Sequence, residues 1–151
     1  MSSLVCVVDA SVAVKLFVAE PLADEAISLF TILTTDPNSV FHVPDLFYVE
    51  TANIFWKQVR NGALSPAQCH ADHAALRSLR LRATPTFDLA DEALALATTH
   101  GVTAYDACYV ALAQRHGVSF ITADDKLVRK FSGSTVSVEW LGSWTPPDDT
   151  P

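Results

Sequence analysis

The chain has 151 residues, half of them hydrophobic, and a formal net charge of −7 at pH 7. This length allows one domain with a sizeable core, and two independent domains would be cramped. The charge argues against a protein that holds nucleic acid by broad attraction to phosphates. The longest apolar stretches are strand-sized and residues 1–8 lack the basic start of a signal peptide, so we expect a cytoplasmic protein that does not enter a membrane.

The first half of the chain predicts strands that alternate with helices. Leu4–Val8 is a continuous apolar run that ends at Asp9, which is typical of a buried parallel strand, and Val40–Val43 predicts a second strand. Helical spacing, prolines near first turns and an Asn-Gly terminator predict helices over 10–18, 22–33, 45–60 and 65–81.

The second half continues the alternation. Strands are predicted over 83–87, 118–121 and 136–138, and helices over 88–100, 104–116 and 124–131, with Asp88 as the cap of the first helix. This pattern indicates an α/β three-layer sandwich with a mainly parallel central sheet. We expect a single domain over 1–144, followed by a loose proline-rich tail over 145–151.

Asp9 and Asp124 each follow a predicted strand. Because the carboxyl ends of parallel strands meet at one edge of a sheet, both side chains are expected at the same edge. Each also has a structural interpretation as the N-cap of the following helix, a role that Thr122 or Asp125 could share at the second position.

Glu50 falls on the helix stripe between Leu46 and Ile54, which is expected to face the core. A buried carboxylate needs a cation, a network of donors or a raised pKa. Asn53 lies one turn further on nearly the same face, where its amide could supply another oxygen.

Asp106 lies near the start of its helix, above Tyr109 on the same stripe, and so points toward apolar surroundings. The alternative is a variant capping box formed with Thr103. Four carboxylates gathered at one edge would repel one another unless a cation lay among them. Oxygen ligands without nearby histidine or thiolate suit Mg²⁺ or Mn²⁺ better than zinc, and such a site suits phosphodiester hydrolysis.

Four short motifs together resemble the PIN domain family, and more narrowly the VapC-type toxins of toxin–antitoxin pairs. They are Val8-Asp9-Ala10-Ser11, Glu50-Thr51-Ala52-Asn53, Tyr105-Asp106-Ala107 and Thr122-Ala123-Asp124. The likeness extends from Leu4 to about Trp140.

The resemblance implies a Mg²⁺- or Mn²⁺-dependent endoribonuclease in which Asp9, Glu50, Asp106 and Asp124 are the metal-binding and catalytic acids. By the same match, Ser11, Asn53 and Thr122 would support these acids or position the substrate RNA. Members of the family commonly form homodimers. Toxins of this type are held inactive by a cognate antitoxin whose C-terminal segment occupies the active-site groove.

The negative charge weighs against RNA binding but does not exclude it. Setting the four site acids aside reduces the net charge from −7 to −3. A basic stripe is one possible source of phosphate contacts, although each member has a simpler interpretation as solvated surface; its candidates are Lys15, Arg77, Arg80 and Arg82.

Two other readings of the acids remain open. Asp9 could be a phosphorylated nucleophile, as in haloacid-dehalogenase-like phosphatases, but that family needs an aspartate two residues later, where this chain has Ser11. Alternatively, the protein is a catalytically weak or inactive PIN-like module that acts by binding a protein partner.

Overall fold

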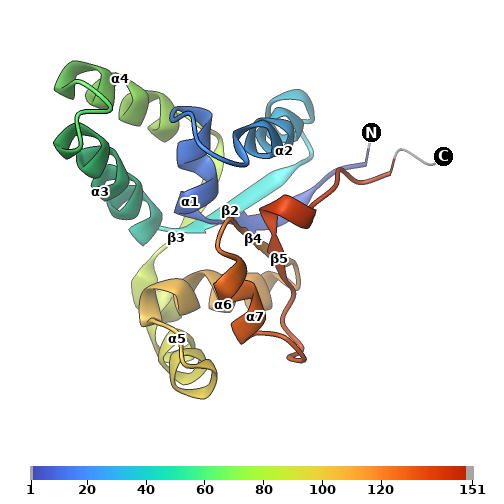
Figure 1. Ribbon diagram of the computed structural model, residues 1–151. Coiled ribbons are helices and arrows are strands. Elements are labelled where there is room, and N and C mark those ends of the chain that lie inside the picture. The colour runs from blue at the N-terminus through green and yellow to red at the C-terminus, as the bar shows by residue number, and fades with distance from the viewer. Residues whose placement is uncertain (1, 149–151) are drawn as a thin grey trace.

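A five-stranded sheet forms the centre of the computed structural model, which describes residues 2–148 (Figure 1). Its strand order is β3-β2-β1-β4-β5, and all four pairings are parallel. The strands are β1 (Val5–Val8), β2 (Val40–Pro44), β3 (Leu81–Thr84), β4 (Ser119–Thr122) and β5 (Val138–Trp140). The sheet is therefore wholly parallel, and its strand order reverses direction beside β1.

Helices cover both faces of the sheet, which confirms the predicted α/β three-layer sandwich and single domain (Figure 1). One layer holds α1 (Ala10–Ala13), the 3-10 turn η1 (Val14–Leu16), α2 (Ala23–Thr35), α3 (Leu46–Arg60) and α4 (Pro66–Arg77). The other holds α5 (Thr86–His100), α6 (Ala104–His116) and α7 (Asp125–Lys130), and a second 3-10 turn, η2 (Leu141–Ser143), follows β5. Helix α6 is the most enclosed, because residues 107–113 are all buried.

The predicted boundaries are wrong at both edge strands. The third strand is Leu81–Thr84 instead of 83–87, and Pro85 is the N-cap of α5, so Asp88 lies in the first turn and is not the cap. The preceding helix stops at Arg77 because Leu81 is needed to pair with Phe41 of β2. The last strand is shifted in the same way, from 136–138 to Val138–Trp140. Neither edge strand contains a buried residue, so neither carries a continuous apolar run that would locate it.

The topology determines where a site can form. The chain leaves β1 toward β2 on one side, whereas β4 pairs with β1 on the other, so the carboxyl ends of β1 and β4 flank a switch in strand order. Residues 145–148 contain no helix or strand, and 149–151 lie outside the described residues, so the tail boundary at 145 stays a prediction. Within residues 2–148, no helix combines the length and the apolar character needed to span a membrane.

Candidate active site

Asp9 directly follows β1 and is 8% exposed. It occupies the N-cap position of α1, but its carboxylate forms no capping hydrogen bond there. Instead, Oδ2 accepts hydrogen bonds from the hydroxyls of Thr122 (2.7 Å) and Ser11 (3.0 Å). Burial raises the pKa of Asp9 from 3.8 to about 6, the two hydroxyls oppose that rise, and the charge of Asp106 adds to it. Asp9 thus stands at the cap position, but the main partners of its carboxylate are the two hydroxyls.

The buried Thr122 connects the ends of the two neighbouring strands. Its hydroxyl donates to Asp9 and accepts from the backbone N–H of Asp124 at 3.1 Å. Ser11 has a parallel role, because its hydroxyl donates to Asp9 and accepts from the N–H of Ala123 at 3.3 Å. The predicted supporting positions of Ser11 and Thr122 thus hold Asp9 in one orientation against the loop after β4.

Glu50 approaches the same edge from α3. The buried face of this helix is formed by Phe47, Thr51 and Phe55, and Glu50 lies half-buried at its border. Its Oε1 accepts a 2.7 Å hydrogen bond from the hydroxyl of Tyr109 on α6. Burial raises the pKa of Glu50 to about 7, the bond from Tyr109 lowers it, and the charges of Asp9 and Asp106 raise it further.

Tyr109 is a site residue that the sequence reasoning missed. Its ring is fully buried and stacks on Phe120 with centroids 5.2 Å apart, as expected of a core aromatic. Only its hydroxyl reaches the site, where it joins the helical layers on opposite faces of the sheet. A tyrosine on a core-facing stripe gives no sign of such a bond, because its partner is 59 residues away in sequence.

Asp106 projects from the first turn of α6 and is half-buried. The hydroxyl of Thr103 caps the helix by accepting from the backbone N–H of Asp106 at 3.1 Å. Half of the capping box is therefore present, but it uses the backbone of Asp106. Burial raises the pKa of the Asp106 carboxyl, the charge of Asp124 raises it further, and Thr103 opposes the rise.

Asp124 is both a cap and an exposed acid. Its Oδ1 accepts from the N–H groups of Lys126 (3.0 Å) and Leu127 (3.3 Å) and so caps α7. The structural interpretation of Asp124 is thus confirmed, while its other oxygen is not used by the helix. The neighbouring Asp125 is exposed and pairs with Arg129 at 3.3 Å, away from this arrangement.

The four acids come from four different parts of the chain, and the charges of neighbouring acids contribute to the raised pKa values of Asp9, Glu50 and Asp106. Asn53 is not part of this network: it is exposed, and within residues 2–148 it forms no hydrogen bond with the acids. In the same part of the chain, no three aspartate, glutamate, histidine or cysteine side chains lie close enough to hold one metal ion as they stand. The acids therefore form a loose cluster.

Two lysines were also missed. A hollow of about 220 Å³ is lined by Asp106, Asp124, Lys126 and Lys130, and both lysines are exposed. They lie one turn apart on α7 beside two of the acids. By contrast, two members of the predicted basic stripe have structural roles: Lys15 pairs with Glu20 at 2.9 Å, and Arg80 donates to three backbone carbonyls.

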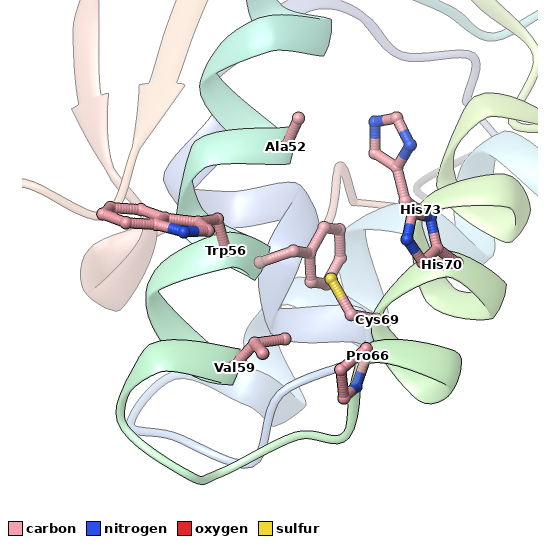
Figure 2. Close-up of a pocket in the computed structure, with 8 residues that line it drawn as sticks. Ala52, Trp56, Val59, Pro66, Cys69, His70 and His73 are labelled. Carbon is pink, nitrogen blue, oxygen red and sulfur yellow. The ribbon is translucent and has the colours of Figure 1, made fainter.

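A separate apolar groove of about 310 Å³ lies between α3 and α4 (Figure 2). Helix α3 contributes Ala52, Phe55, Trp56 and Val59, and α4 contributes Pro66, Cys69, His70 and His73. His70 is exposed, whereas His73 is half-buried with its ring edge-on to Phe55.

The sequence profile of the PIN domain matches residues 6–131. The chain belongs to the PIN domain family. Among relatives of this PIN domain, Ribonuclease VapC3 of Pyrobaculum aerophilum is 35% identical over 127 residues, which cover 83% of this chain and 93% of the relative. Exonuclease VapC9 of the same organism is 32% identical over 93 residues, which cover 61% of this chain and 67% of the relative.

Solved structures share the fold at lower identity. PAE2754 from Pyrobaculum aerophilum matches with a TM-score of 0.66 and 23% identity, over 93% of this chain and 85% of that one. A toxin–antitoxin complex from Klebsiella pneumoniae matches with a TM-score of 0.60 and 18% identity, over 89% and 95%. These likenesses confirm the PIN-like architecture.

Proposed function

We propose that this PIN domain is a metal-dependent endoribonuclease and the toxin of a toxin–antitoxin pair. The observation that carries the proposal is the convergence of Asp9, Glu50, Asp106 and Asp124 beside the switch in strand order, with burial and mutual repulsion raising the pKa of the first three. The relative named as a ribonuclease, 35% identical over most of both chains, supports this reaction class.

The residues fit a divalent cation. Carboxyl groups whose charged forms are disfavoured by burial and by each other are stabilised when a cation binds among them. Their donors are all oxygen, which suits Mg²⁺ or Mn²⁺. Asp9, Glu50, Asp106 and Asp124 would hold the ion, with small movements because no three of the described acids are preassembled.

When bound, the ion would polarise the phosphodiester and lower the pKa of an attacking water. The protein's own residues define the rest of the site. Thr122 and Ser11 hold Oδ2 of Asp9 and so restrict the orientation of its carboxylate. Tyr109 fixes Glu50 from the opposite layer. Lys126 and Lys130 lie where they can contact substrate phosphates as point charges.

The decisive experiment is cleavage of a structured RNA pool with Mn²⁺ or with EDTA. We expect Mn²⁺-dependent cleavage that Asp9→Asn abolishes, because the substitution removes a ligand charge while preserving the shape of the side chain. Asp125→Asn is the matched control, since it removes the same charge from an exposed neighbour of the site. Cleavage retained by Asp9→Asn would contradict the assignment of Asp9.

The mode of cutting requires its own test, because one relative is named as an exonuclease. A circular RNA has no ends, so only an endonuclease can cut it. We expect cleavage of linear and circular forms of the same RNA. Cleavage of the linear form alone would establish an exonuclease.

A partner-binding role is the second candidate, and the groove between α3 and α4 favours it (Figure 2). An apolar groove between helices suits the apolar face of an amphipathic partner helix. We propose an antitoxin as this partner, consistent with the fold shared with a toxin–antitoxin complex, and a homodimer as the resting assembly. If cleavage is absent while a co-encoded protein binds the wild type but not a Val59→Asp variant, partner binding is the main function.

A further inference from the structure

Two aromatic side chains stand almost free in solvent beside the acids. Phe87 is 90% exposed and Tyr105 is 69% exposed. Phe87 lies in the first turn of α5, just after β3, and Tyr105 immediately precedes Asp106 in α6. Since all strands are parallel, the end of β3 lies at the same edge of the sheet as Asp9. Exposed apolar side chains are informative when they form a contiguous surface, because such patches mark binding sites.

The two rings line one hollow of about 490 Å³. Its remaining wall is made of small or apolar side chains from three helices, Leu46, Ala90, Ala93, Ala104 and Cys108 among them. The volume lies in the range of small-ligand pockets, roughly 300–1,000 Å³. The hollow therefore has the size and apolar character that a flat organic ring requires.

This hollow adjoins the acid cluster. Leu46 lies one helical turn before Glu50, on the same side of α3. Burial raises the pKa of the Cys108 thiol, and the nearby charges of Glu50 and Asp45 raise it further. The first turn of α6 contributes to two hollows, with Tyr105 in the apolar one and Asp106 in the one that holds the lysines.

We propose that Phe87 and Tyr105 form a stacking platform for an unpaired base of the RNA strand that the carboxylates cut, an inference that rests on the function proposed above. A strand crossing the site would place phosphates near Lys126 and Lys130 and a base against the rings. Aromatic rings bind unpaired bases by stacking, with little dependence on sequence.

The charge of the protein favours this mode of binding. With a net charge of −7, four acids in the site, and Lys15 and Arg80 engaged elsewhere, phosphate contacts alone are a weak source of affinity. Stacking adds affinity without positive charge. It also requires the base to be unpaired, so the platform selects loops and single strands over duplex.

The test measures binding of a labelled single-stranded RNA of mixed sequence by fluorescence anisotropy, in an Asp9→Asn background that does not cut it. Phe87→Leu and Tyr105→Leu keep apolar bulk but lose the aromatic plane, and each should weaken binding about tenfold. Phe87→Trp and Tyr105→Phe keep a ring and should bind as before. Binding of duplex RNA should be equal for all variants.

Leu94 provides the matched control. It is 60% exposed and lies two turns after Phe87 on the same face of α5, but it does not line the hollow. Leu94→Ser should leave RNA binding unchanged. Unchanged binding by both leucine variants at the platform would overturn the inference. The oligomeric state, measured by light scattering, could also overturn it. If Phe87→Leu, Tyr105→Leu and Leu94→Ser each convert a dimer to monomers, this face of α5 is a contact between two copies of the chain.

The same variants separate this inference from the proposed function. Wild-type cleavage that Phe87→Leu and Tyr105→Leu leave unaltered, with unaltered binding, would refute the platform and keep the nuclease. Absence of wild-type cleavage, with binding that still depends on the two rings, would refute the nuclease and keep the platform as an RNA-binding surface.

Discussion

Asp9→Asn should make the protein more stable at neutral pH while it removes activity. Asp9 is 8% exposed, and its pKa rises from 3.8 to about 6 on folding. Ionising it in the folded protein therefore costs about 3 kcal/mol more than in the unfolded chain. Both hydroxyl donors bind the same atom, Oδ2, so an amide oxygen placed there keeps the bonds from Thr122 and Ser11. We expect the variant to gain about 2 kcal/mol, because bonds to a neutral oxygen are weaker.

The pH dependence follows from the direction of this shift. A carboxyl whose pKa is raised by folding destabilises the protein above the folded value of about 6, and this penalty disappears as the pH falls below 3.8. Urea unfolding with EDTA should show the largest gain at pH 8 and little at pH 4. The control Asp125→Asn should change stability by less than about 0.5 kcal/mol. A variant no more stable than wild type at pH 8, or a gain independent of pH, would refute the reasoning.

Three further predictions concern the same edge of the sheet and its surroundings. Mn²⁺ should raise the melting temperature of the wild type, by an amount equivalent to about 2.7 kcal/mol at a hundredfold excess over Kd, and much less in Asp9→Asn; equal shifts would remove Asp9 from the metal site. Thr122→Val should lose about 1–3 kcal/mol in urea unfolding, since it leaves the N–H of Asp124 without its acceptor and removes one of the two hydroxyls that donate to Asp9. Thr122→Ser keeps the hydroxyl and should lose less. Burial and the nearby charges of His116 and Arg82 lower the pKa of His42 to about 4. The unfolded chain therefore takes up a proton that the folded protein does not, and stability is lost as the pH falls from 6.5 toward 4. His42→Phe should reduce this loss, as measured by thermal melts at several pH values.

The fold could be predicted from sequence where a buried segment has a clear apolar pattern or clear terminating residues. The central strand β1 is a continuous apolar run, and α6 is bounded by Thr103 and Gly117, so both were located within a residue. The bounds of the edge strands β3 and β5 were predicted wrongly, because each pairs with a strand on one side only and contains no buried residue. Neither strand therefore has such an apolar run. Tertiary pairing with β2, not local sequence, determines that Leu81 is in a strand.

Topology accounts for the part of the candidate site that sequence could place, while the roles of its residues stay predictions. Asp9 and Asp124 were placed together because parallel strands end at one edge. The bond between Tyr109 and Glu50, and the position of Lys126 and Lys130 beside Asp106, depend on how helices from different layers dock. Local periodicity carries no information about that docking. Asn53 lies one helical turn from Glu50 and is exposed, and its supporting or substrate-positioning role stays a prediction.

Because Asp124 is both a helix cap and a candidate site acid, selection for folding and selection for activity can be told apart at this edge of the sheet. One oxygen holds the start of α7, so the fold itself favours a side chain that accepts hydrogen bonds at this position whether or not the protein cuts anything. Glu50 and Asp9 also accept hydrogen bonds, from Tyr109 and from Thr122 and Ser11, but their burial as charges opposes folding. If the proposed activity were no longer under selection, we would therefore expect substitutions at Glu50 and Asp9 first, while a capping residue would be kept at position 124. The proposed activity therefore predicts retention of the two costly acids, whereas the fold alone accounts for retention of Asp124.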